Sequence, residues 1–250
     1  MAVYMRVMHF RKRYLLFAII LALIVAKIYD QTQIKLEQEA IEAMSWSVAN
    51  KVIVIDPGHG GVDPGKVSPN GVEEKNINLE ISKRLATILG QAGAAVILTR
   101  ETDTHLSGDG IKGMSSRHRE DLSQRVKMAN DRNADLFISI HCNSYPDASQ
   151  HGAQVFYQPG SKESQRLANC IQEEITRLLA NTRRTPKAVD FFITRNTNMP
   201  TVIVETGFIT NAKEEKLLLD PAYQSKMAWS IYAGVIKYYA ENVENTEQAN

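Results

Sequence analysis

The sequence contains few cysteines, no excess charge of either sign and only one long apolar run. Its two cysteines, Cys142 and Cys170, cannot form a disulfide framework, and we expect both to be free thiols. Lysine and arginine total 29 against 28 aspartates and glutamates, so no global field favours nucleic acid as a partner. Neither an internal repeat nor a low-complexity tract is present. At 250 residues and 44% hydrophobic composition, the chain fits one globular domain with a short appendage.

The single apolar run lies near the N-terminus and predicts export. Thirteen apolar residues, 14–26, follow the basic residues Arg6, Arg11, Lys12 and Arg13. This order is typical of a secretory signal peptide, whereas a membrane-spanning helix needs roughly 18 or more apolar residues. We therefore expect residues 1–28 to be a signal peptide or an N-terminal membrane anchor. The basic flank keeps its end cytoplasmic, so the rest of the chain would be extracytoplasmic, either secreted or anchored, and would meet the membrane only through this segment.

The remaining residues divide into a linker or stalk at 29–50, a catalytic domain at 51–241 and a polar tail at 242–250. Short apolar runs, typical of strands buried on both faces, alternate with helical periodicity. We predict an α/β fold with three layers, in which helices flank a six-stranded, largely parallel twisted sheet. The expected strands are 52–55, 95–99, 136–140, 153–157, 189–193 and 201–205, and the expected helices are about 77–89, 121–130, 162–179 and 222–239.

A polar, glycine-containing segment at 102–123 is longer than a minimal connection. Loops of this length are commonly functional or mobile. We expect a lid, a partner-binding loop or a surface excursion here, and the sequence does not choose among them.

Two histidines come where strands are expected to end. His59 follows the first strand in VIVIDPGHGG, and His141 directly follows the third in FISIHCNS. Ligands bind at the carboxyl ends of strands in open α/β sheets, so both imidazoles should lie on one edge. Glu73 or Glu74, at the start of the next helix, could add a carboxylate, and spacing does not distinguish them. Two imidazoles and a carboxylate with an open fourth position are typical of catalytic zinc. The histidines without such a setting are His9, His105, His118 and His151.

A carboxylate ends the last strand, where Glu205 follows four apolar or β-branched residues in TVIVETGF. Burying this charge is costly unless the carboxylate is paired or has a chemical role. A structural ion pair with a lysine or arginine is the alternative. Beside a zinc ion, Glu205 would act as a general base and then as a general acid toward a departing amine. The set predicts metal-assisted amide hydrolysis.

Four ordered segments, DPGHGGVDPG, GVEEKNINL, SIHCN and VETGFITN, resemble the zinc-dependent N-acetylmuramoyl-L-alanine amidases of the amidase 3 type, which hydrolyse peptidoglycan. The resemblance covers about residues 51–239. It implies that His59, Glu74 and His141 bind Zn²⁺ and that Glu205 is the catalytic glutamate. It further implies cleavage of the lactyl amide between N-acetylmuramic acid and L-alanine of the stem peptide, and a six-stranded sheet.

Two further residues of the shared motifs, Asp63 and Asn143, are either supports or substrate contacts, or ordinary turn residues. The chain lacks the repeated wall-binding modules of many relatives, and residues 144–151 leave no room for a long inserted helix after His141. This layout, with segment 190–196, is similar to the germination-specific amidases of spore-forming bacteria. That similarity implies a role in spore cortex maturation, including muramic lactam formation.

Two other functions remain open at this point. A zinc exopeptidase of carboxypeptidase-like architecture would use similar ligands and needs an arginine for the substrate carboxylate, for which Arg100 and Arg195 are available. A peptidoglycan-binding protein with little activity alone would depend on a partner, for which segment 102–123 offers a contact. An activating protein partner is also compatible with the amidase reading.

Overall fold

The computed structural model describes residues 12–108, 110–111 and 113–248, and it divides into two units, one up to Met44 and one from Ser45. The first unit is helix α1 (Lys12–Ala43). Within it, Tyr14–Gln33 has a mean hydropathy of 1.8 and is long and apolar enough to cross a membrane, with none of that stretch buried. These properties agree with a signal sequence or an anchor. The basic residues Arg6 and Arg11, expected to flank the apolar run, lie outside the described residues.

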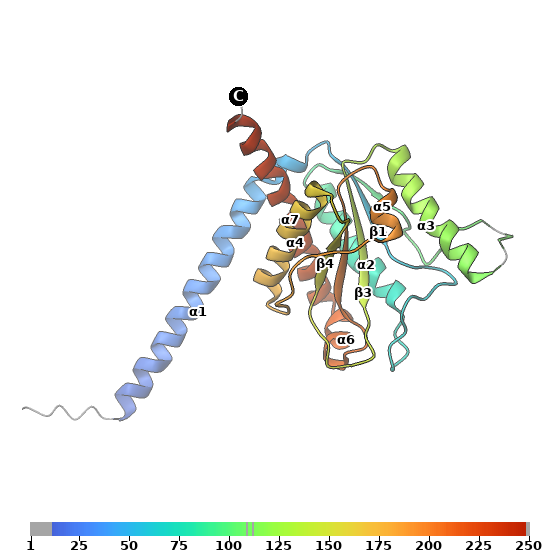
Figure 1. The fold of residues 1–250 in the computed structure, drawn as a ribbon. Helices are drawn as coiled ribbons and strands as arrows, with labels where there is room; N and C mark the ends of the chain where they lie inside the picture. The colour runs from blue at the N-terminus through green and yellow to red at the C-terminus, as the bar shows by residue number, and fades with distance from the viewer. Residues whose placement is uncertain (1–11, 109, 112, 249–250) are drawn as a thin grey trace, which may run out of the picture. The chain divides into compact units, whose positions relative to one another are not determined.

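The second unit is a mixed α/β domain, and it confirms the predicted six-stranded sheet (Figure 1). The strands lie in the order β2-β1-β3-β6-β4-β5, and every neighbouring pair is parallel except β4 with β6. Their bounds are β1 (Val52–Pro57), β2 (Ala95–Leu98), β3 (Leu136–Asn143), β4 (Gln154–Tyr157), β5 (Lys187–Ala188) and β6 (Thr201–Phe208).

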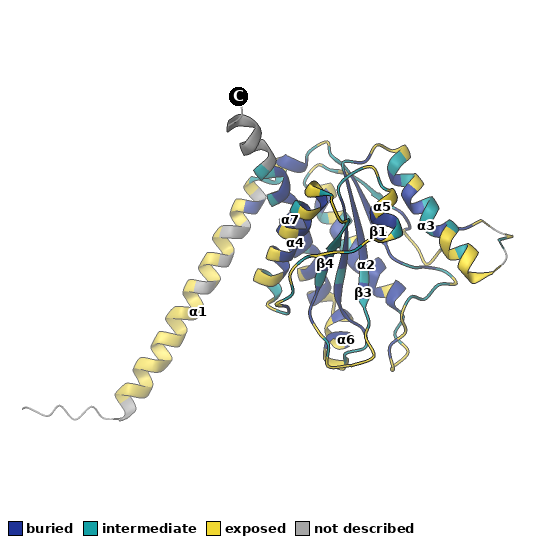
Figure 2. Cartoon of the chain, in the orientation of Figure 1, coloured by how far each residue is buried: buried dark blue, intermediate teal, exposed yellow. Residues whose placement is uncertain are grey.

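Helices cover both faces of this sheet. Helices α2 (Glu74–Gln91), α4 (Lys162–Leu179) and α7 (Pro221–Gln248) pack together on one face, whereas α3 (Met114–Asp131) and α5 (Phe192–Asn196) lie on the other. The remaining elements are the 3₁₀ turn η1 (Ser45–Val48) and α6 (Ala212–Leu218). Central strands are almost wholly buried, as Figure 2 shows, because both of their faces contact helices. Their carboxyl ends thus form one accessible edge for a site.

The predicted strand at 189–193 is wrong. The chain forms the two-residue β5 before this segment and the short α5 after Phe191. Aromatic and β-branched residues favour a strand, but the amide of Arg195 donates to the carbonyl oxygen of Phe191 over 3.0 Å, which is helical bonding. Phe192 and Ile193 pack against the core under α3, so tertiary contacts outweigh the local preference.

Other elements also differ from expectation. The predicted loop 102–123 is too long, because α3 begins at Met114; its first turns are exposed and carry no apolar periodicity (Figure 2). Helix α7 continues to Gln248 through most of the expected polar tail, and residues 249–250 lie outside the description. Helix α6 was not anticipated, although Asn211 caps it by accepting from the amides of Lys213 and Glu214. By contrast, the helix predicted at 162–179 is confirmed as α4.

A buried ion network holds the β1 end of the sheet. Arg125 of α3 is 1% exposed and donates to Asp56 over 2.6 Å and to Asp121 over 2.6 Å. Burial opposes ionisation of Asp56, but Arg125, helped by hydroxyl donors, lowers the pKa of Asp56 below its ordinary value. Arg125 also donates to the carbonyl oxygens of Pro57 and His59 over 2.8 and 2.7 Å. It therefore links the core to the turn that carries His59.

Replacing Arg125 with methionine should lower the free energy of unfolding by about 3–5 kcal/mol, because the buried Asp56 charge loses its partner. Urea denaturation followed by circular dichroism measures this effect. Arg119→Met is the control, because Arg119 lies exposed on the same helix. A loss no larger for Arg125→Met than for Arg119→Met would contradict the stabilising role of the network.

Candidate active site and metal centre

His59 lies in the turn after β1 in an unusual backbone conformation, with φ of +63°. Few residues other than glycine adopt this backbone conformation, so surrounding contacts must stabilise it at His59. The Arg125 bond to its carbonyl oxygen does so. The Nδ1 atom of His59 lies 2.8 Å from an oxygen of Asp63, and Nε2 lies 3.3 Å from Oε1 of Glu74. Asp63 therefore orients the ring and leaves Nε2 facing the site, the role that a carboxylate plays behind a metal-binding histidine.

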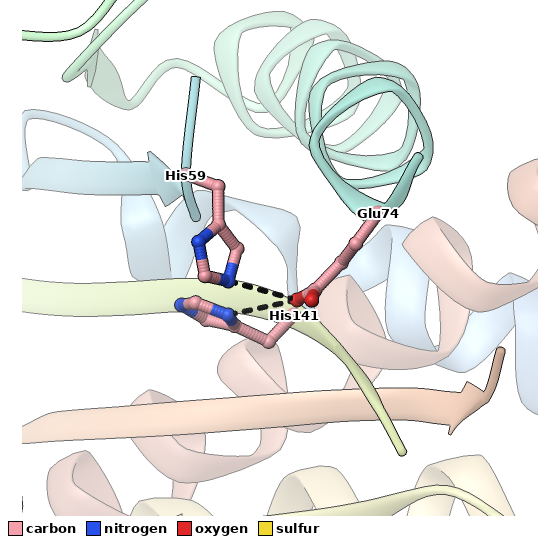
Figure 3. Close-up of side chains that lie close together, drawn as sticks. All are labelled: His59, Glu74 and His141. Carbon is pink, nitrogen blue, oxygen red and sulfur yellow. Dashed lines mark hydrogen bonds and ion pairs between the residues drawn. The ribbon is translucent and has the colours of Figure 1, made fainter. Parts of the chain in front are cut away.

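The two candidate glutamates at the N-terminus of α2 differ in their contacts and burial. Glu73 precedes α2, and its carboxylate lies 3.4 Å from the ammonium of Lys75. Glu74 is 2% exposed and points at both histidines, as Figure 3 shows. Its oxygens also accept from the amides of Lys66 over 2.9 Å and Cys142 over 3.0 Å. Burial opposes its ionisation, but the histidines outweigh it and lower the pKa of Glu74, so the carboxylate stays charged.

His141 lies within β3, which continues to Asn143, rather than after the strand as expected. It is the Cα partner of Glu205 on the neighbouring parallel strand β6, so the two side chains emerge on the same face. Its Nδ1 lies 3.0 Å from Oε1 of Glu74. The irregular register after His141 bends the strand end where this side chain enters the site. A Cβ atom on Gly58 would overlap the His141 imidazole, which explains the glycine there.

The donor atoms of His59, Glu74 and His141 converge within 4.8 Å of one another (Figure 3). Two imidazole nitrogens and one carboxylate oxygen are a typical ligand set for a catalytic zinc site that keeps a position open. The ring centroids of His59 and His141 lie 4.9 Å apart and the ring planes are inclined at 80°, so the two imidazoles present their nitrogens from different directions. Burial opposes protonation of His59, but its hydrogen bonds and ion pairs with Asp63 and Glu74 favour the cation and raise the pKa of His59 to about 10. A site that attracts a proton so strongly also suits a metal cation.

Glu205 has no hydrogen bond at Oε2 although this atom is buried, and no ion pair among the described residues. The alternative of a structural salt bridge is therefore not supported. Burial raises the pKa of Glu205 to about 7, with His141 opposing the rise and Glu74 adding to it. A carboxylate oxygen that is buried without a partner beside three candidate metal ligands is costly unless it acts on a ligand.

Two cavities meet at this cluster. One has a volume of about 550 Å³ and the other about 240 Å³, and they share His59, His118, His141 and Glu205. His118 and His105 were not predicted as site residues, but both line the larger cavity. Nδ1 of His118 lies 3.5 Å from Asp63, at the start of a helix that carried no apolar signal. His151 instead lies exposed beside the carbonyl oxygen of Ser149, and His9 lies outside the described residues.

Asp63 and Asn143 differ in their roles. Asp63 holds His59 and also accepts from the amide of Gly65, whereas Asn143 accepts from the following amide of Ser144 while lining the larger cavity. Asp63 is therefore a positioning residue for the histidine. Asn143 therefore stabilises the local turn and also lies where a ligand in the cavity could contact it.

Two buried arginines, Arg100 and Arg125, support the turn after β1, and no sequence pattern predicted this role for either. Arg100, 3% exposed, donates to the carbonyl oxygens of Pro57, Gly58 and Lys75 over 2.8–3.0 Å. It is therefore not free to bind a substrate carboxylate. Arg195, the other arginine considered for an exopeptidase, pairs with Asp190 at 2.5 Å. Neither arginine matches what the exopeptidase reading requires.

Comparison with known proteins agrees with this site. The family model described as N-acetylmuramoyl-L-alanine amidase matches residues 53–237. The germination-specific N-acetylmuramoyl-L-alanine amidase of Bacillus subtilis is 42% identical over 205 residues, covering 81% of this chain and 86% of that protein. The amidase AmiA of Escherichia coli is 30% identical and covers 77% of this chain and 78% of its own length.

Solved structures place the fold in the same group. The CwlD amidase of Clostridioides difficile, solved in complex with the GerS lipoprotein, aligns with a TM-score of 0.75 and 39% identity over 76% of this chain and 99% of that one. The catalytic domain of CwlV from Bacillus (Paenibacillus) polymyxa aligns with a TM-score of 0.67 and 35% identity over 75% and 97%. With the family model spanning nearly the whole folded unit, this chain belongs to the zinc-dependent N-acetylmuramoyl-L-alanine amidases and is an amide hydrolase.

Proposed function

We propose that the chain cleaves the lactyl amide of peptidoglycan with a Zn²⁺ ion held by His59, Glu74 and His141 and with Glu205 as the catalytic base. The observation that carries this proposal is the half-buried Glu205, whose Oε2 atom is buried without a hydrogen bond, beside three converging donor atoms. When bound, zinc would act as a Lewis acid on the scissile carbonyl and on water.

The residues of the chain would then divide the work. Glu205 accepts a proton from the attacking water and delivers it to the nitrogen of L-alanine as the amide bond breaks. Asp63 keeps the proton of His59 on Nδ1, so that Nε2 keeps its lone pair for binding the metal. Glu74 keeps its charge because the imidazoles and backbone amides stabilise the carboxylate. The cavities on either side accommodate the two halves of the substrate.

Digestion of purified peptidoglycan tests this function. The products should be intact stem peptides with L-alanine at the amino end and glycan with free lactyl carboxyl groups, as identified by mass spectrometry. A chelator should abolish their release, and added zinc should restore it. Release of single amino acids would instead indicate an exopeptidase and contradict the proposal.

The biological setting is proposed from the relatives. Similarity to the germination-specific amidase of Bacillus subtilis and to CwlD supports a role in spore cortex maturation. Deletion of the gene should then remove muramic lactam from the cortex. A cortex of unchanged composition together with a defect in vegetative cell separation would contradict the spore role.

Export and partner dependence complete the proposal. We assign residues 1–28 to a signal peptide or anchor that places the domain at 51–241 outside the cytoplasm, where cell-wall substrate lies. Cell fractionation with detection of the intact N-terminus distinguishes the two. CwlD was solved with the GerS lipoprotein, which supports an activating partner for this chain as well. Full activity of the purified chain without any addition would argue against that requirement.

A further inference from the structure

The 240 Å³ cavity differs in chemistry from the larger one. Outside the four residues that the cavities share, its wall is apolar and consists of Leu122, Phe191, Phe192, Ile193 and Ile203. No lysine or arginine and no additional carboxylate lines it. Its opening therefore suits an uncharged group with apolar faces.

The 550 Å³ cavity has a cationic wall. Lys66 and Arg117 line it, and neither forms an ion pair among the residues that the structure describes. Three carboxylates that line this cavity are already engaged, since Asp63 and Glu74 pair with histidines and Asp121 pairs with Arg125, whereas Glu205 lies among the residues shared with the smaller cavity. Away from the residues that the two cavities share, the unpaired charges of this wall are therefore those of Lys66 and Arg117, and they suit an anionic ligand.

The two halves of the amidase substrate differ in the same way. Once its lactyl carboxyl group is part of the amide, the N-acetylmuramoyl group is uncharged, whereas the stem peptide carries free carboxylates. We propose, on the basis of the amidase function above, that the 240 Å³ cavity is the subsite for the muramoyl sugar and that Phe191 is its specificity-determining residue. The stem peptide then extends along Lys66 and Arg117.

The position of Phe191 supports this role. Its side chain is 37% exposed and lines the cavity, so the ring is accessible to a ligand. The ring stands perpendicular to Phe156 at 5.9 Å between centroids, so its orientation is set before a ligand arrives. An exposed aromatic face carries partial negative charge and attracts the C–H-bearing face of a pyranose ring.

The backbone beneath Phe191 is also held in place. Thr194 donates to the side chain of Gln158 over 2.8 Å, which fixes α5 to the β4 side of the sheet. Phe192 and Ile193 line the cavity too but also pack against the core, whereas Phe191 is the more exposed of the two phenylalanines. Because Phe191 makes few core contacts, its replacement should leave the fold intact.

Two substrates of identical peptide sequence test the subsite, one with the disaccharide attached to the lactyl group and one N-lactoyl peptide without sugar. Phe191→Ala should lower kcat/KM about tenfold for the disaccharide substrate, chiefly through KM, as expected for loss of one aromatic contact. The sugar-free substrate should be cleaved by the variant and the wild type with equal kcat/KM. Phe191→Trp should retain the preference for the disaccharide substrate.

Tyr145→Ala is the matched control, because Tyr145 is exposed and lines neither cavity. Arg117→Gln should raise KM for both substrates. When the peptide carboxylates are amidated, the variant and the wild type should have the same KM. Equal losses on both substrates with Phe191→Ala, or no loss on either, would overturn the subsite. Failure of the wild type to cleave the disaccharide substrate would refute the amidase function itself, and with it the subsite.

Discussion

Replacing Glu205 with glutamine is expected to lower kcat by about 10²–10⁴-fold, the range of a lost general acid–base group. Glutamine keeps the shape of the side chain but cannot accept the proton of the attacking water. Oε2 of Glu205 is buried without a hydrogen bond, so the wild-type carboxylate is not engaged by another protein group at this oxygen and is free to accept that proton. Single-turnover assays on disaccharide peptide measure the effect directly.

Metal binding and folding should survive this substitution, because Glu205 is separate from the three donor residues. The variant should bind one zinc ion per chain and unfold at a temperature no lower than that of the wild type, because the substitution removes a charge that is costly to bury. Glu80→Gln, an exposed carboxylate on α2, serves as control and should leave kcat unchanged. A Glu205→Gln variant that keeps more than a tenth of the wild-type kcat would show that another group is the base.

Replacing His141 with alanine should remove both the metal and the activity. Two remaining protein ligands hold catalytic zinc poorly, and even loss of a group behind a ligand commonly lowers affinity about 10–100-fold. The loss for a direct ligand should exceed that range. Competition with a chromogenic chelator measures affinity, and elemental analysis of the purified protein gives the zinc content.

Two variants set the scale for His141→Ala. His105→Ala should retain zinc, because His105 lines the cavity but lies outside the cluster of donors. Asp63→Asn should weaken zinc binding to an intermediate degree, because the hydrogen bond that orients His59 is weakened. Full zinc occupancy in His141→Ala would refute the assignment of the ligands.

Local sequence determined the elements whose pattern and environment agree. Helix α4 coincides with its predicted bounds, because Ser161 caps it and its apolar residues recur on one face. The strand prediction for segment 189–193 was wrong for the opposite reason. Its composition favours a strand, but Phe192 and Ile193 belong to α5 and pack against the core under α3. The start of α3 was missed because its exposed first turns have no periodicity to read.

The site divides in the same way. The sequence alone predicts His59, His141 and Glu205 as site residues, because each comes at the carboxyl end of an apolar run and the ends of parallel strands share one edge of the sheet. The family motifs, rather than spacing, selected Glu74, and the structure supplies the physical reason, since Glu74 is buried toward the histidines while Glu73 pairs with Lys75.

Only the tertiary structure brought Asp63 against His59, placed Arg125 and Arg100 beneath the turn, and set Phe191 beside an apolar cavity. These contacts join residues from different elements, and their geometry depends on how strands and helices pack rather than on any local pattern. The chain thus carries its chemistry in short motifs at strand ends. The orientation of those groups and the shape of the substrate site arise from long-range packing.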